Sequence, residues 1–228
     1  MLEIERLTVR FGGLEALADL DLTLAPGAAL GLIGPNGSGK TTLFNAISGI
    51  VQPAAGRIMF QGRDLVGRAP YQIARAGIAR TFQTVRVFQR MTVRDNVRSA
   101  STDKGKAVDA LLSRVGLATL EDTLAGELPL MEQRRLEIAR VLAHQPCLVL
   151  LDEPSGGLSP GETEEMIQLL KEVVLPAAAT ILIEHKLALI EALCPRAALL
   201  VQGRKAAEAA PADLLRHPTL QETYLGVR

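Results

Sequence analysis

A glycine-rich segment that ends in a lysine and two threonines is the part of this sequence best suited to chemistry. It follows the apolar run 28–33 directly. Glycine allows the backbone torsions that turn several amide N–H groups toward one anion, and a lysine adds a full positive charge. A helix beginning at Thr41 would direct its positive end to the same point. The spacing therefore predicts a phosphate-binding loop for a nucleoside triphosphate, formed by Gly34, Pro35, Asn36, Gly37, Ser38, Gly39, Lys40, Thr41 and Thr42.

Two carboxylates, Asp152 and Glu153, follow a second apolar run at residues 147–151. In parallel sheets the carboxyl ends of strands open onto the ligand crevice. At such an edge Asp152 is predicted to support Mg²⁺, with the Thr41 hydroxyl as a further ligand. Glu153 is predicted to act as the base that polarises the attacking water, since phosphoryl transfer depends mainly on positioning and charge stabilisation.

Two further polar residues follow strand-like runs. His185 comes just after the apolar residues 180–183, where it could bond the γ-phosphate and orient the water. Gln83 follows residues 78–82 and offers a carbonyl to Mg²⁺ and an amide to water. On spacing alone, a structural histidine and an ordinary polar loop residue remain open alternatives.

The elements that would position these residues belong to an α/β fold. Nearly continuous apolar runs at 28–33, 147–151, 180–183 and 197–201 predict parallel strands covered on both faces, separated by helices. Alternating apolar residues at 2–9 and 20–24 predict an antiparallel sheet, and helical periodicity dominates 93–143. We expect one domain over 1–228: a P-loop NTPase core (1–90 and 146–228) with an N-terminal antiparallel β subdomain, and an inserted α-helical subdomain (91–145).

Composition limits the partners and the setting. The chain has 228 residues with 25 basic and 25 acidic side chains, so no basic excess favours a nucleic-acid partner. Cys147, placed inside a strand, and Cys194 lack the spacing of a zinc site or disulfide framework. The apolar-rich stretch 173–183 is interrupted by Pro176 and is shorter than the roughly 20 residues that span a bilayer. We therefore expect a chain without its own transmembrane segment, in a reducing cytoplasm.

Taken in order, these motifs resemble the ATPase subunit of an ATP-binding cassette (ABC) transporter over essentially the whole chain. Segments 10–17, 31–49, 79–88, 91–97 and 224–226 are similar to the branched-chain amino acid importer subfamily, and urea and amide importers share much of this pattern. The resemblance implies a peripheral ATPase on the cytoplasmic face of the membrane. Such subunits dimerise head to tail around ATP and Mg²⁺, and they drive transmembrane permease subunits served by a separate solute-binding protein.

The resemblance also implies individual roles. Phe11 would stack on adenine, and Gln83 would couple Mg²⁺ to the membrane subunit. Asp152 would support Mg²⁺, Glu153 would be the catalytic base, and His185 would sense the γ-phosphate.

The sequence departs from the family at the signature motif. A Leu-Ser-Gly-Gly-Gln motif or a close variant is expected before Gln133, and residues 128–132 instead read Leu-Pro-Leu-Met-Glu. Pro129 removes a hydroxyl and an N–H, Leu130 and Met131 add side chains, and Glu132 adds negative charge near an anion. The prediction is one good and one degenerate half-site, which favours a heterodimer over a homodimer and makes hydrolysis dependent on a partner. Alternatives are a relaxed but working signature, a weakly hydrolysing regulatory subunit, and a soluble ABC protein without a transport role.

Three smaller features follow from the same comparison. Ser159 stands where the family commonly has Asp or Asn, and its spacing to Glu162 predicts a helix-capping box. Lys186 replaces a common acidic residue. Apolar side chains around Gln83 suit either a groove for a helix of a membrane subunit or packing beneath the helical subdomain; they are Phe82, Val85, Val87 and Phe88.

Overall fold

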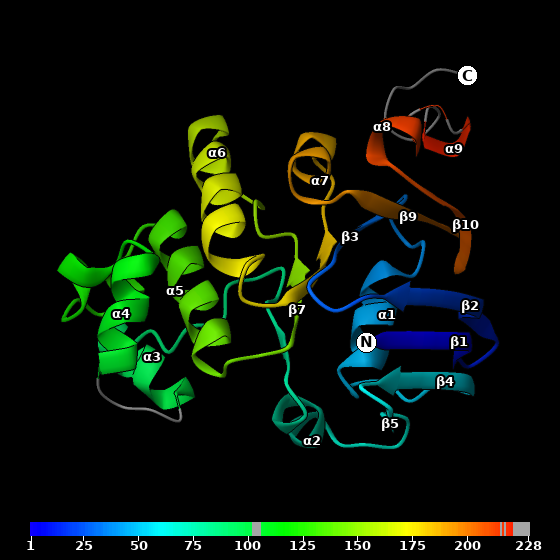
Figure 1. Cartoon of the computed structure of the whole chain (residues 1–228), viewed down its shortest axis with the longest axis horizontal. Helices are drawn as coiled ribbons and strands as arrows, with labels where there is room; N and C mark the ends of the chain where they lie inside the picture. The colour runs from blue at the N-terminus through cyan, green and yellow to red at the C-terminus, as the bar shows by residue number, and fades with distance from the viewer. Residues whose placement is uncertain (102–105, 215, 217, 221–228) are drawn as a thin grey trace.

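A six-stranded sheet with helices on both faces forms the centre of the molecule (Figure 1). The computed structural model describes residues 1–101, 106–214, 216 and 218–220; segment 224–226 lies outside them. Its strands lie in the order β10 (Arg204–Ala209), β9 (Arg196–Val201), β3 (Ala29–Ile33), β8 (Ala179–Ile183), β7 (Leu148–Asp152) and β6 (Ile78–Arg80). All neighbours pair in parallel except β10 with β9. The prediction of a parallel sheet from continuous apolar runs is confirmed.

Strand β7 shows why these runs are continuous. All its residues are buried, and successive side chains point to opposite faces of the sheet. Leu148 and Leu150 enter one hydrophobic core, together with the antiparallel sheet and helix α1 (Lys40–Ile47). Val149 and Leu151 enter the other, together with the helices between β6 and β7. With both faces covered by apolar cores, no position in the strand favours a polar side chain until Asp152 at its end.

A second sheet is antiparallel, as the alternating patterns predicted. It has the order β2 (Leu14–Leu24), β1 (Leu2–Phe11), β4 (Ala55–Phe60) and β5 (Arg63–Asp64). The inward-facing residues of β1 are buried, whereas most of those between them are exposed. Helix α1 lies between this sheet and the parallel one, and Leu43, Phe44 and Ile47 fill the space. The helix that follows the phosphate loop is thus fixed from both sides.

Helices fill the chain between β6 and β7 and form a separate lobe beside the sheet (Figure 1). They are α3 (Val93–Ala100), α4 (Lys106–Arg114) and α5 (Leu130–Ala143), with short 3-10 turns at Ala118–Leu120 and Ala125–Glu127. The predicted helical periodicity over 93–143 therefore matches the structure. The division into subdomains at residues 90 and 145 stays a prediction.

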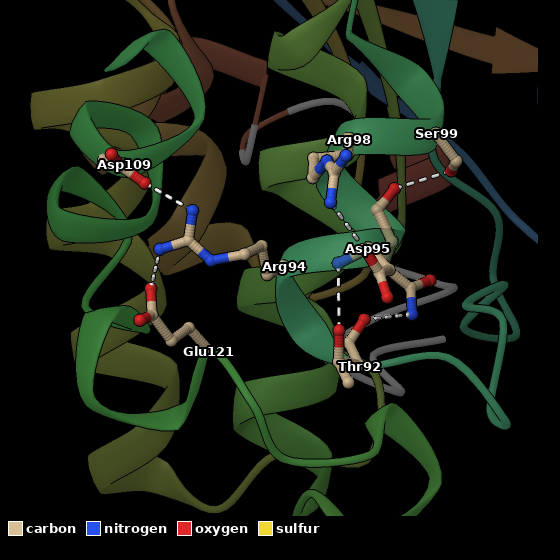
Figure 2. A network of polar contacts seen from close by, with 8 residues as sticks. Thr92, Arg94, Asp95, Arg98, Ser99, Asp109 and Glu121 are labelled. Atoms are coloured by element: carbon tan, nitrogen blue, oxygen red, sulfur yellow. Dashed lines mark hydrogen bonds and ion pairs between the residues drawn. The ribbon is translucent and has the colours of Figure 1, made fainter. Parts of the chain in front are cut away.

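One arginine ties this lobe together. Figure 2 shows Arg94 of α3 reaching both Asp109 of α4, at 2.6 Å, and Glu121 after the first 3-10 turn. Thr92 caps α3 by accepting a hydrogen bond from the N–H of Asp95 at 3.1 Å. Hydrogen bonds to Asp109 and Glu121 raise the pKa of the Arg94 guanidinium. Polar contacts thus fix the outer side of helices whose inner sides share an apolar core.

The remaining helices complete the faces of the sheets. They are α2 (Pro70–Arg75), α6 (Pro160–Leu169), which continues as a π-helical turn over Leu170–Val174, α7 (Leu187–Leu193), α8 (Pro211–Leu214) and α9 (Pro218–Leu220). No helix in the described part of the chain is long and apolar enough to cross a membrane.

Two details of the sequence interpretation can be compared with the structure. Cys147 does not lie inside a strand: β7 begins at Leu148, and Cys147 is exposed because it precedes the first residue covered on both faces. The capping box is confirmed, since the Ser159 N–H donates to Glu162 at 2.8 Å and its hydroxyl accepts from the Glu162 N–H at 3.4 Å. Lys186 donates to the Thr163 hydroxyl at 2.7 Å, which ties α6 to the segment after β8.

Candidate active site

The phosphate loop connects β3 to α1, and two of its glycines lie against the backbone of neighbouring strands. A Cβ on Gly34 would lie 2.1 Å from the carbonyl oxygen of Leu200, and one on Gly39 would lie 2.7 Å from that of Ala16. Both glycines also have positive φ, 147° and 104°. Gly37 also has a positive φ, 77°, but a Cβ there would meet nothing within 4 Å. The loop is therefore clamped at both ends by neighbouring strands and open in the middle.

Lys40 lies folded against this loop. Its ammonium donates to the carbonyl oxygens of Gly34 at 2.7 Å and Pro35 at 3.0 Å, and the residue is only 6% exposed. Burial lowers the pKa of Lys40, while the nearby Glu153 and Asp152 carboxylates act in the opposite direction. An anion in the loop would compensate this buried charge.

Two other observations fit a phosphate group at the same place. Within the described part of the chain no side chain caps the N-terminus of α1, so its first N–H groups are available to an anion. The buried hydroxyl of Ser38 has no hydrogen-bond partner among the described residues. The loop thus brings together the Lys40 ammonium, the Ser38 hydroxyl and the first N–H groups of α1, all of which could donate to a phosphate group.

The order of the strands brings the other predicted residues to one edge. Strands β3, β8, β7 and β6 are neighbours, and the phosphate loop, His185, Glu153 and Gln83 follow them in that order. Nε2 of His185 lies 2.8 Å from Oε1 of Glu153, and Nε2 of Gln83 donates to Oε2 of the same carboxylate at 3.0 Å. Glu153 has φ of 50°, a conformation that is uncommon outside glycine. Three residues separated by up to 102 positions therefore meet at one carboxylate.

Asp152 has a partner that sequence reasoning missed. Nη2 of Arg80 donates to Oδ2 of Asp152 at 2.7 Å, and the two side chains are 7% and 5% exposed. Nη1 of Arg80 donates to Oδ1 of Asn45, on α1, at 2.6 Å. The backbone N–H of Asp152 donates to the hydroxyl of Thr81 at 3.0 Å. A charged residue within the run 78–82, which otherwise resembles a buried strand, was the available signal.

Helix α5 holds the Gln83 loop through a second buried pair, also missed. Arg134 donates to the carbonyl oxygens of Phe82 at 3.1 Å and Gln83 at 2.8 Å, and to that of Gly156 at 3.3 Å. Glu137 lies 3.5 Å from Arg134 and accepts from the N–H of Phe82 at 3.3 Å. Burial raises the pKa of Glu137, against the pull of these donors. The helical lobe is thereby linked to the loops that carry Gln83 and Glu153.

The segment predicted to be a degenerate signature, residues 128–132, lies at the start of α5. Pro129 occupies the N-cap position with φ of −58°, and no side chain caps the helix. Met131 is 3% exposed and belongs to the core of the lobe, whereas Leu130 is 38% exposed and Glu132 is half-buried. Met131 therefore cannot be one of the side chains predicted to hinder binding of an anion, and the prediction is limited to Leu130 and Glu132. Leu130 also packs over Gly157, where an added Cβ would lie 2.9 Å from its side chain.

The donors predicted for Mg²⁺ fit that ion in kind. No group of three or more His, Cys, Asp or Glu residues able to hold a metal occurs in the part of the chain that the structure describes. Mg²⁺ commonly takes only one or two carboxylates beside phosphate oxygens, hydroxyls and water. The Thr41 hydroxyl, the side-chain carbonyl of Gln83 and the Asp152 carboxylate would meet this need. Thr42, the next residue of α1, is half-buried.

Phe11 stands apart from the cluster at the strand ends. It ends β1 in the antiparallel sheet and is 50% exposed at the tip of the β1–β2 hairpin. An ion pair between Arg10 and Glu15, at 2.5 Å, holds this tip together. The adenine contact predicted for Phe11 stays a prediction.

A groove of about 660 Å³ opens beside the Gln83 loop. All four apolar residues predicted around Gln83 line it, and Ile50, Ile73 and Arg140 line it as well. Phe88 is 50% exposed, whereas Val87 also packs against the core of the helical lobe. The predicted packing against the helical lobe is therefore seen for Val87, and a groove is present, whereas its use by a helix of a membrane subunit stays a prediction.

Comparison with known proteins identifies the class to which this fold and site belong. Residues 17–156 match the family model described as ABC transporter. The chain belongs to the ABC transporter family, as an ATP-hydrolysing cassette. The match contains the phosphate loop and ends just beyond Asp152 and Glu153.

Relatives cover nearly the whole chain. The high-affinity branched-chain amino acid transport ATP-binding protein LivG of Escherichia coli K12 is 36% identical over 99% of this chain and 98% of its own. The lipopolysaccharide export system ATP-binding protein LptB of Acidithiobacillus ferridurans is 33% identical over 91% of this chain and 89% of its own. The ADP conformation of MJ1267, an ATP-binding cassette of an ABC transporter, superposes with a TM-score of 0.88 at 28% identity, covering 100% of this chain and 99% of the other. The predicted family and fold are confirmed.

Proposed function

We propose that this chain is the ATP-hydrolysing subunit of an importer for branched-chain or related amino acids, and that it works beside a second, different cassette. The observation that carries the proposal is an asymmetry. Gln83 and His185 both bond the Glu153 carboxylate, whereas the start of α5 has Pro129 and Leu130 in place of serine and glycine. Similarity to a LivG protein supports amino acids as the cargo. A urea or amide importer is the alternative within the same subfamily.

The proposed reaction is in-line attack of water on the γ-phosphate of ATP. Glu153 accepts a hydrogen bond from the water, while His185 and Gln83 hold the carboxylate by both oxygens. Lys40 leaves its two carbonyl partners and bonds the β- and γ-phosphates. Mg²⁺, when bound by Thr41, Gln83 and Asp152, supplies charge neutralisation at the phosphate oxygens.

The groove beside Gln83 supports a membrane partner. Its apolar lining and its volume of about 660 Å³ suit one amphipathic helix from a transmembrane permease subunit. The loop that would report occupancy of this groove is the loop that Arg134 and Glu137 hold against α5. On this proposal the chain lies at the cytoplasmic face of the membrane and meets the solute-binding protein only through the permease.

A test of the heterodimer compares ATP hydrolysis by the purified chain alone with that of the chain mixed with a cassette whose signature is intact. We expect slow turnover alone and a rise of at least roughly tenfold in the mixture, since one missing anion-binding site commonly costs 10²–10³ in rate. Equal rates in the two samples would contradict the heterodimer.

The second candidate function is a regulatory, weakly hydrolysing subunit, which the altered signature favours. In the same mixture, this role predicts that a Glu153→Gln variant of the chain leaves the rate unchanged. Loss of the stimulated rate in that variant would instead assign hydrolysis to this chain.

A further inference from the structure

We propose that Arg80 is a positioning residue of the ATP site, which holds the Asp152 carboxylate in a fixed relation to helix α1. The inference rests on the proposed role of Asp152 in supporting Mg²⁺. Arg80 ends β6, and its guanidinium spans two elements: Nη2 donates to Asp152 at the end of β7, and Nη1 donates to Asn45 on α1. Because α1 begins at Lys40, one side chain connects the phosphate-loop helix to the metal carboxylate.

The surroundings of Arg80 leave its guanidinium little freedom. The side chain is 7% exposed, and its Cζ lies 5.4 Å from the ring centre of Phe44 and 5.0 Å from that of Phe82. The planar group between two rings keeps its two donors aimed at fixed acceptors. A lysine would supply the charge at one point and could not reach both acceptors in this geometry.

The bond to Arg80 also determines how Asp152 can act. Oδ2 accepts from Arg80, so Oδ1 is the oxygen left for a water of Mg²⁺. Asp152 is 3% exposed, and without Arg80 this buried carboxylate would lose the ion pair that fixes its orientation. Arg80 therefore keeps the Asp152 carboxylate in one orientation relative to helix α1.

The same side chain faces the apolar groove, whose lining includes Arg80 and Phe82. A helix seated in this groove would press on the Phe82 ring that stacks on Arg80. The Arg80 side chain thus both lines the groove and bonds Asp152 directly. This places the positioning of the metal carboxylate within reach of a bound partner.

The test measures Mg²⁺-dependent nucleotide binding, which needs no turnover and no partner. A fluorescent ATP analogue is titrated into the purified full chain at increasing Mg²⁺ and in EDTA. We expect Arg80→Gln to raise the half-saturating Mg²⁺ by roughly 10- to 100-fold, the usual cost of losing a residue that orients a metal ligand. Binding in EDTA should stay within about twofold of that of the unmodified chain, and Arg80→Lys should recover part of the loss.

Controls separate this role from a structural one. Arg75→Gln removes an arginine stacked on Tyr71, 5.7 Å from its ring centre, and should leave the Mg²⁺ dependence unchanged. Adding Arg80→Gln to Asp152→Asn should cost nothing further, because the two act as one unit. If Arg80→Gln does not fold, Asn45→Ala, which removes the bond on the α1 side, should raise the Mg²⁺ midpoint by a smaller factor.

The outcomes distinguish this inference from the proposed site. An unchanged Mg²⁺ midpoint in Asp152→Asn would contradict the role of Asp152 itself. A raised midpoint in Asp152→Asn with an unchanged one in Arg80→Gln, or losses that add in the double variant, would overturn the role of Arg80 alone.

Discussion

The phosphate loop and the start of α5 are both helix N-termini, but they are built in opposite ways. Helix α1 follows Gly39, which has positive φ, and the loop before it is open at Gly37. Helix α5 follows Pro129, and its exposed first residue is Leu130. In both cases no side chain caps the helix among the described residues. An uncapped helix end is therefore not enough to predict an anion site, because the approach of an anion also depends on the residues in front of the helix.

A second contrast concerns what lies behind each end. Behind the phosphate loop, charged side chains converge on the strand ends, and Glu153 is bonded on both oxygens. Behind the signature, Met131 enters an apolar core and Arg134 turns away toward the Gln83 loop. The first region gathers the residues that we propose carry out the chemistry of this chain. The second region stabilises the first through the bonds from Arg134 to the Gln83 loop. These bonds would persist even if the start of α5 made no contact with ATP.

The largest expected effect comes from removing the proposed base, Glu153, from the half-site that contains the phosphate loop. In a mixture with a cassette that carries an intact signature, Glu153→Gln should lower phosphate release by on the order of 10²–10⁴-fold, since the amide cannot accept the proton. Binding of ATP should persist. The matched control is Glu191→Gln, an exposed position on α7. Stimulated turnover that survives in Glu153→Gln would refute the catalytic role.

The next largest effect should come from removing Arg134, which connects α5 to the Gln83 loop. Arg134→Ala would leave Glu137 buried without its partner, and this typically costs about 3–5 kcal/mol in the free energy of unfolding. Urea denaturation measures the loss. The neighbouring pair of Arg135 with Glu165, at 2.8 Å, is largely exposed on the glutamate side, so Arg135→Ala should cost only about 1 kcal/mol or less. Similar losses in the two variants would contradict a stabilising role of the buried pair of Arg134 with Glu137.

A smaller effect should come from repairing the degenerate end. The combined changes Pro129→Ser, Leu130→Gly and Glu132→Gln restore a hydroxyl and backbone access while keeping the buried Met131. ATP hydrolysis by the chain alone should then rise by roughly tenfold, and it should fall again when Glu153→Gln is added. An unchanged rate would mean that the signature already works or that another feature limits the homodimer.

The smallest effect concerns a helix end that is capped. Ser159→Ala should lower the free energy of unfolding by about 1 kcal/mol, because α6 loses its N-cap. Hydrogen bonds from Ser159 lower the pKa of Glu162, so their stabilisation is present above the ordinary glutamate pKa and is lost as the pH falls through the lowered value. Urea denaturation at several pH values should show this dependence weaken in the variant. Ser113→Ala, exposed on α4, is the control and should be nearly neutral.

Much of the site followed from local patterns. Glycine spacing predicted the phosphate loop, and the rule that parallel strands end at one edge placed Glu153 and His185 together. Gln83 was assigned to the same site only through the family resemblance. The same reasoning failed for Cys147, because an apolar residue next to a strand is not distinguished from one inside it. It also counted Met131 among the obstructing side chains, although the residue is buried in the helical lobe.

Local patterns, then, were enough for the class of fold and for the residues that bear the chemistry, because strand and helix periods and backbone torsions depend on near neighbours. They did not identify Arg80 or Arg134. Arg80 meets a carboxylate 72 positions away and Arg134 meets carbonyl groups 51 and 52 positions away. Such pairings depend on which strands become neighbours and how α5 packs, so tertiary structure alone decided how Asp152 and the Gln83 loop are held.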